Sequence, residues 1–119
     1  MNKIYHLATC ATNQRILNEV GALQKNIELQ EIKTQPITPQ QLDAMQRLAG
    51  SYEALFSRKA LKFRAMGLHE KQLTEADYRN LLLQEYTFLK RPAAIINNQI
   101  FIGNAKATVA ALKAAIAKL

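Results

Sequence analysis

The sequence contains a single cysteine, Cys10, among 119 residues. One cysteine cannot form an intramolecular disulfide, so the composition gives no sign of an oxidising compartment. The N-terminus lacks the basic-then-apolar pattern of a secretory signal. No apolar run approaches the roughly 20 residues that a membrane-spanning helix needs. From these absences we expect a cytoplasmic protein without a membrane association.

Metal-binding and nucleotide-binding patterns are also missing. The two histidines, His6 and His69, are distant in the sequence and do not make a recognisable ligand set with one cysteine. No glycine-rich phosphate-binding loop is present. We therefore expect neither a bound metal nor a bound cofactor.

Negative charge is scarce, with 9 Asp and Glu against 16 Lys and Arg and a formal net charge of +7. This charge is compatible with nucleic acid, acidic proteins or small anions as partners. We interpret the densest basic stretch, residues 58–64, as the solvated face of a helix. Aromatic residues are not clustered and no nucleic-acid-binding motif is present, so direct nucleic-acid binding is not expected.

The length and a hydrophobic content of 49% suit one globular α/β domain. A strand at residues 3–7, a helix that opens near Thr12 and Asn13, and a strand at residues 27–32 predict a βαβ unit with parallel strands. The apolar side of that helix is expected to consist of Ile16, Leu17, Val20 and Leu23.

The rest of the chain predicts a helical block at about residues 38–88 and then a ββα unit. Thr38 and Thr74 are expected to cap helices in the block, and Ser51 and Ser57 can each cap a short one. Two strands, at residues 93–96 and 99–102, flank a turn formed by two asparagines. A closing helix is expected to start near Asn104.

Cys10 lies where the first strand passes into the first helix. Unpaired N–H groups and the positive end of the helix dipole favour a thiolate in such a turn. Cysteines in surroundings of this kind titrate between roughly 3.5 and 7.5, against about 8.5 for a free thiol. Our hypothesis is that Cys10 is a nucleophile that attacks a disulfide or an oxyanion. The alternative is a small, buried hydrophobic residue without chemistry.

The order of elements, with a cysteine after the first strand and a proline before the third, resembles the thioredoxin-like fold with the helical block as an insertion. In that fold the proline is usually cis and approaches the reactive sulfur, so the resemblance implies that Arg91 and Pro92 face Cys10. The alternative is a trans proline that starts an edge strand.

Several short motifs, in order and spacing, resemble the glutaredoxin-coupled arsenate reductase family, which also contains the Spx-type transcription regulators. They are Ile4-Tyr5-His6 with Cys10, Leu55-Phe56-Ser57-Arg58, Gly67-Leu68, Leu73-Thr74, Leu89-Lys90-Arg91-Pro92 and Ile102-Gly103.

The resemblance implies roles for individual residues. Cys10 matches the nucleophile that attacks arsenate and later forms a mixed disulfide with glutathione. His6 matches a histidine that adjusts the thiol, although a strand-end histidine bonded to backbone is an alternative. Arg58 and Arg91 match two arginines that gather around the oxyanion, where planar donors suit a tetrahedral anion. For each arginine the alternative is a surface or helix-capping cation.

The sequence also departs from the family pattern. Asn104 stands where the reductases have a third arginine, and a helix N-cap would explain it. Gln14 stands at another arginine position, which Arg15 could replace after a small shift. Fewer cations imply weaker capture of arsenate. Asn13 stands where Spx-type regulators have the second cysteine of C-x-x-C, so an intramolecular disulfide switch is impossible.

We therefore expect a monothiol reductase that acts through Cys10 with glutathione or glutaredoxin on arsenate, another oxyanion or a disulfide. The alternative is a non-catalytic, Spx-like regulator or protein-binding module that docks on RNA polymerase.

Overall fold

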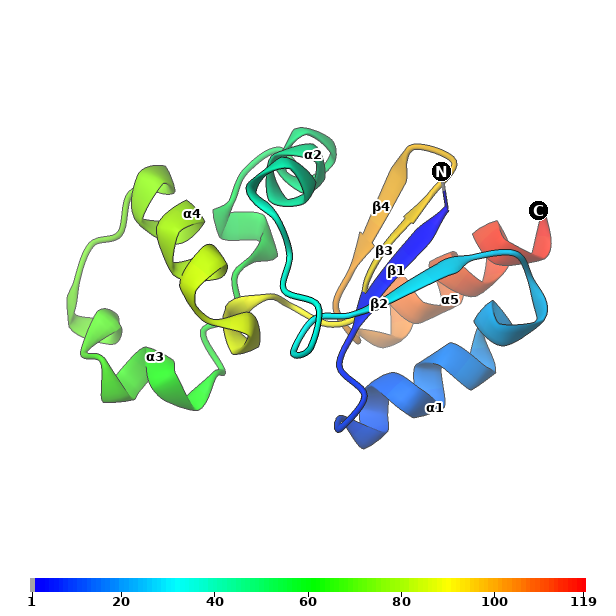
Figure 1. Ribbon diagram of the computed structural model, residues 1–119, viewed down its shortest axis with the longest axis horizontal. Coiled ribbons are helices and arrows are strands. Elements are labelled where there is room, and N and C mark those ends of the chain that lie inside the picture. Colours follow the sequence, from blue (N-terminus) through cyan, green and yellow to red (C-terminus); the bar gives the residue numbers. More distant parts are fainter. Residues whose placement is uncertain (1) are drawn as a thin grey trace. The chain divides into compact units, whose positions relative to one another are not determined.

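The computed structural model describes residues 2–119, which form two compact units. The first unit contains residues 2–35 and 91–119, and the second contains Pro36–Lys90. The chain therefore leaves the first unit once and returns to it once (Figure 1). The second unit covers the residues of the expected helical insertion. No helix among the described residues is long and apolar enough to cross a membrane.

The first unit is built on a four-stranded mixed sheet with the order β2-β1-β3-β4. β1 pairs with β2 in parallel, whereas β3 pairs with β1 and β4 in antiparallel fashion. The strands are β1 (Lys3–His6), β2 (Glu28–Glu31), β3 (Ala93–Ile96) and β4 (Gln99–Ile102). The predicted parallel βαβ unit and the predicted hairpin are both present.

The hairpin turn is formed by Asn97 and Asn98, which have φ angles of 50° and 64°. A two-residue turn with both φ angles positive matches the right-handed twist of the flanking strands, and asparagine adopts this conformation more readily than most residues. The turn residues thus fix the register between β3 and β4.

Two helices, α1 (Ala11–Glu19) and α5 (Lys106–Ala117), pack on the sheet of the first unit (Figure 1). Ile4 of β1 and Ala94 of β3 are register partners and lie in the same buried cluster as both helices. The helices contribute five large aliphatic side chains to that cluster: Ile16, Leu17, Val109, Leu112 and Ile116.

One residue of the predicted apolar side of α1 is misplaced. Leu23 is 61% exposed, and Ala22 takes the buried position instead. The reason is Gly21, whose φ of 76° follows the end of α1 and turns the chain into a short 3₁₀ turn at Ala22–Gln24. The helical spacing therefore no longer applies at Leu23.

The regular secondary structure of the second unit consists of helices, and an isolated β-bridge joins Phe56 to Leu89. Thr38 and Thr74 cap helices as predicted, and each forms a capping box with the residue three positions further along. Ser57 does not cap a helix, because α3 starts later and its N-cap is Ala60. The α-helices are α2 (Pro39–Ala49), α3 (Leu61–Ala65) and α4 (Glu75–Gln84), with 3₁₀ turns at Glu53–Leu55, Leu68–Glu70 and Tyr86–Phe88.

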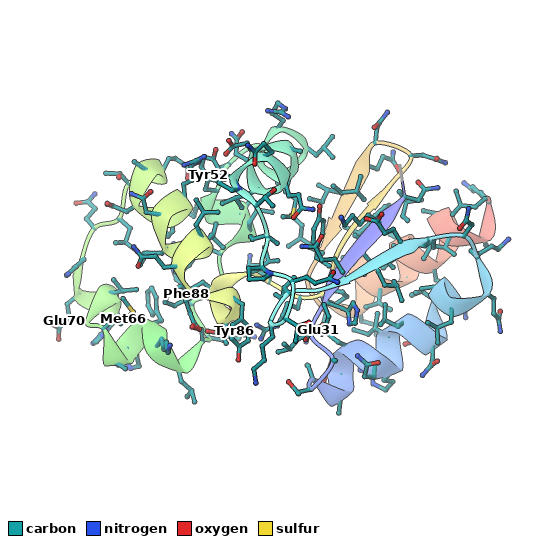
Figure 2. All side chains as sticks on the ribbon, in the orientation of Figure 1. Glu31, Tyr52, Met66, Glu70, Tyr86 and Phe88 are labelled. Atoms are coloured by element: carbon teal, nitrogen blue, oxygen red, sulfur yellow. The ribbon has the colours of Figure 1, made fainter. Side chains whose placement is uncertain are left out.

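An aromatic cluster centred on Phe56 lies in the core of the second unit, beside buried aliphatic side chains such as Leu42 and Leu55. Its ring is stacked on Phe88 at 4.8 Å and meets Tyr78 edge-on at 5.0 Å between ring centroids. Phe56 and Phe88 (Figure 2) are both fully buried. This cluster holds together segments that are separated by about 20 to 30 residues in the sequence.

Candidate functional site

Cys10 is the N-cap residue of α1 and follows β1 after a three-residue loop. Its backbone is extended, with φ −93° and ψ 110°, and its carbonyl accepts the N–H of Gln14 at 3.1 Å. The first residue of α1 is thus Ala11, one residue before the start that the sequence predicts near Thr12. Cys10 is half-buried and stands at the positive end of a nine-residue helix, where a negative charge is stabilised.

The Asn13 side chain connects the sulfur to the loop. Its Oδ1 accepts the backbone N–H of Leu7 at 2.9 Å, and its Nδ2 donates to Cys10 Sγ at 3.5 Å. Asn13 is only 1% exposed; its contact with Leu7 is buried and its contact with the sulfur is partly buried. The sequence indicated Asn13 as a residue near the helix start and as the replacement for a second cysteine, but not as a contact of the sulfur.

Glu31, at the end of β2 (Figure 2), also contacts this loop. One carboxylate oxygen accepts the N–H of Ala8 at 2.9 Å. The other accepts the N–H of Lys33 and both the N–H and the hydroxyl of Thr34. These hydrogen bonds, with that from Ala8 the largest contribution, lower the pKa of Glu31 to about 2. Sequence reasoning missed Glu31 altogether.

The Glu31 hydrogen bonds predict a specific pH dependence of stability. The folded pKa lies below the unfolded value of about 4.5, so the contribution is complete above that pH and is lost as the pH falls towards 2. We expect Glu31→Gln to lower the free energy of unfolding at pH 7, and the difference from wild type to shrink between pH 4.5 and 2.

The measurement is urea unfolding at pH 7, 4 and 2.5. Glu19→Gln is the matched control, because Glu19 is exposed and its carboxylate forms a long 3.6 Å ion pair with Arg15. A difference between wild type and Glu31→Gln that stays constant over this pH range would contradict the prediction.

His6 ends β1 and is buried. Burial lowers the pKa of His6, and the nearby Glu31 carboxylate opposes this only in part. At neutral pH the imidazole is therefore mainly uncharged, and it contributes no full positive charge to its surroundings. Its Nδ1 is buried and has no hydrogen-bond partner within residues 2–119.

The Arg91–Pro92 peptide bond is cis. Tyr5 pairs with Ala93 across β1 and β3, so the same register places Pro92 opposite His6. His6 is the last residue of β1, and the Cys10 loop follows it. The Pro92 carbonyl accepts the N–H of Gly103 at 2.9 Å. Arg91 Nη1 is a buried donor without a hydrogen-bond partner in the described part of the chain.

Two weaker candidates also belong to the first unit. Arg15 is 68% exposed on α1, and its partner is Glu19, one helical turn away. Asn104 is exposed and does not cap α5; the N-cap of that helix is Ala105, without a side-chain cap. The predicted N-cap role of Asn104 is therefore wrong, because α5 begins one residue further along.

Arg58 belongs to the second unit. Its guanidinium donates to Glu53 at 2.6 Å and to the Tyr78 hydroxyl at 2.7 Å. The Glu53 hydrogen bond is the main cause that raises the pKa of Arg58. These partners give Arg58 a structural role within its own unit, and its expected part in oxyanion binding stays a prediction.

The described residues contain no group of three His, Cys, Asp or Glu that could hold a metal ion. The chemistry that the first unit offers is that of a half-buried sulfur at a helix N-terminus with a hydrogen-bond donor to that sulfur. Arg91 adds a buried guanidinium nitrogen that has no hydrogen-bond partner among the described residues. Nucleophilic thiol chemistry on a disulfide or an anionic substrate fits these groups.

Comparison with known proteins places this site in context. The model of the ArsC family matches residues 5–112. No curated protein sequence matches the chain closely enough to count as a relative.

Solved structures are similar over most of their length. A candidate arsenate reductase from Yersinia pestis has a TM-score of 0.78 at 17% identity, covering 93% of this chain and 99% of that one. An arsenate reductase from Vibrio cholerae has a TM-score of 0.78 at 16% identity, with coverages of 93% and 96%. An arsenate reductase related protein from Brucella melitensis has a TM-score of 0.71 at 20% identity, with 92% of each chain covered. These similarities confirm the predicted α/β, thioredoxin-like fold.

Proposed function

The chain belongs to the ArsC family, and on that basis we propose that it is a monothiol oxidoreductase whose nucleophile is Cys10 and whose cycle is completed by glutathione or glutaredoxin. The observation that carries the proposal is the position of Cys10 as the N-cap of α1, with its sulfur as the acceptor of a side-chain hydrogen bond. Both features stabilise a thiolate, which is the nucleophilic form.

With a disulfide substrate, the Cys10 thiolate attacks one sulfur, a new S–S bond forms and the second sulfur leaves as a thiolate. An external thiolate then attacks this mixed disulfide and releases Cys10. The electrons balance because one disulfide is consumed and one is formed.

With arsenate as the oxyanion, the thiolate displaces hydroxide from pentavalent arsenic, and the hydroxide leaves as water after protonation. Reduction to the trivalent state takes two electrons, which two thiols supply when they leave as a disulfide. The chain has one cysteine, so at least one of these thiols must come from another molecule. Glutathione and glutaredoxin are the partners that we propose.

The test of this function is intact-mass analysis after exposure to oxidised glutathione, followed by a coupled assay for arsenate-dependent oxidation of glutathione. We expect one glutathione adduct on Cys10 that excess glutathione or glutaredoxin removes. Turnover with arsenate would identify the oxyanion, whereas an adduct without such turnover would favour a disulfide substrate. An inert Cys10 would exclude the proposal and favour a protein-binding module, with RNA polymerase as the first partner to test.

Arg91 is the residue that we propose for oxyanion binding, because its buried Nη1 has no partner among the described residues. Lysine keeps the charge of arginine but loses the planar pair of donors. We expect Arg91→Lys to raise the arsenate concentration that halves the rate of Cys10 alkylation by about tenfold, as suits the loss of one hydrogen bond to a charged group. Protection from iodoacetamide measures this without any need for turnover.

Arg64→Lys is the matched control, since Arg64 is exposed and is not a candidate for oxyanion binding. It should leave arsenate protection unchanged. Equal protection of wild type and Arg91→Lys would remove Arg91 from the proposed site.

A further inference from the structure

Asn13 is a polar side chain with both ends of its amide engaged inside the protein. It is 1% exposed, and a buried amide is costly unless its donors and acceptor find partners. One partner is the backbone of Leu7 and the other is the sulfur of Cys10. No described contact of Asn13 stabilises the first turn of α1 by capping, since the N-cap of that helix is Cys10 without a side-chain cap.

The orientation of the Asn13 amide follows from the chemistry of its first partner. The Leu7 N–H can only donate, so the atom 2.9 Å from it must be the amide oxygen. The amide nitrogen then points to the other side, where it lies 3.5 Å from Cys10 Sγ. The Leu7 hydrogen bond therefore fixes an N–H donor on the sulfur rather than a carbonyl oxygen.

The loop that Asn13 holds is itself immobilised at three further points. The Cys10 N–H donates to the Leu7 carbonyl at 3.1 Å, the Gln14 side chain donates to the same carbonyl at 3.4 Å, and the Ala8 N–H donates to Glu31. The donor and the sulfur are thus parts of one hydrogen-bonded turn.

We propose that Asn13 is a catalytic residue whose amide N–H stabilises the thiolate form of Cys10, in the position where a second cysteine would otherwise form a disulfide. The inference rests on the proposed function, for which Cys10 must be the nucleophile. A hydrogen bond to an anion is stronger than one to a neutral acceptor, so this donor favours the charged sulfur. It also keeps the site a monothiol, because an amide cannot compete with the external thiol for the mixed disulfide.

The test is the rate of Cys10 alkylation by neutral iodoacetamide at pH 6.5 and at pH 10 in the full-length protein. Asn13→Asp keeps an oxygen to accept the Leu7 N–H but has no N–H to give to the sulfur. We expect its rate at pH 6.5 to be about tenfold below that of wild type, the effect of losing one hydrogen bond to a charged group. At pH 10, where thiolates predominate in both proteins, the rates should be nearly equal.

Asn18→Asp is the matched control, because it makes the same amide-to-carboxylate change on the same helix. Asn18 is exposed and lies outside the hydrogen-bonded turn that holds the sulfur. We expect a much smaller decrease at pH 6.5 than for Asn13→Asp. An equal decrease in the two variants would assign the effect to charge alone and overturn the proposal, as would an Asn13→Asp decrease of the same size at both pH values.

A second measurement needs no change at Asn13. In the wild type, the NMR signals of the Asn13 side-chain amide protons should shift with pH, and the midpoint of this shift should equal the midpoint of the pH profile of Cys10 alkylation. The same signals should not shift in Cys10→Ser. Resonances insensitive to the ionisation of Cys10 would overturn the proposal. If the wild-type thiol reacts at pH 6.5 but Asn13→Asp reacts equally fast, only the Asn13 inference fails. If the wild-type thiol is inert, the proposed function fails.

Discussion

Replacement of Cys10 by serine is expected to abolish the glutathione adduct and any oxyanion-dependent turnover, while the protein stays folded. The hydroxyl of serine is not ionised near neutral pH and is a poor nucleophile without an adjacent base. The chain has no second cysteine that could take over. The glutathione adduct should therefore be absent by intact-mass analysis, and the rate in the coupled glutathione assay should equal that of the uncatalysed reaction.

The fold of Cys10→Ser should be unharmed for a physical reason. Cys10 is the N-cap of α1, and serine is among the residues preferred at that position, since its oxygen can accept an N–H of the first turn. Its unfolding midpoint in urea should equal or slightly exceed that of wild type. Full activity in a folded Cys10→Ser protein would refute nucleophilic catalysis by this residue.

The largest loss of stability is expected for Phe56→Ala in the second unit. Phe56 is 0% exposed and its ring contacts those of Phe63, Tyr78 and Phe88. Truncation of a buried phenylalanine costs ~3–5 kcal/mol through lost transfer energy and the cavity left behind. Urea unfolding followed by circular dichroism would measure the difference, and hydrogen exchange would locate it within Pro36–Lys90.

Leu61→Ala is the control for this prediction, because Leu61 is a similar apolar residue of the same unit but is 91% exposed. Its effect should stay within about 0.5 kcal/mol. A Phe56→Ala protein that is as stable as Leu61→Ala would mean that the aromatic cluster is not the core of the second unit.

Local sequence signals predicted the elements whose determinants are themselves local. The two capping boxes begin at Thr38 and Thr74, and each depends on residues three positions apart. The hairpin depends on the tolerance of Asn97 and Asn98 for positive φ. In each case the interacting groups are neighbours in the chain, so no knowledge of the tertiary structure is needed.

The errors of the sequence interpretation lie at the ends of elements. Helical spacing predicts Leu23 on a buried face that ends at Gly21, and residue preference predicts Ser57 and Asn104 as caps of helices that begin later. A shift of one to three residues in a helix boundary changes which side chain can reach the free N–H groups. Periodicity and residue preference do not resolve such shifts.

The sequence by itself determined that the chain has one sulfur, that this sulfur follows the first strand, and that any thiol cycle needs an external thiol. These conclusions depend on counting and on the order of elements along the chain. Only the tertiary structure decided which groups hold the sulfur and its loop. Glu31 is 23 residues from Ala8 and meets it because burial of the sheet fixes the parallel register of His6 with Glu31. Hydrogen bonds between distant residues follow from that register, which is set by the packing of the whole unit.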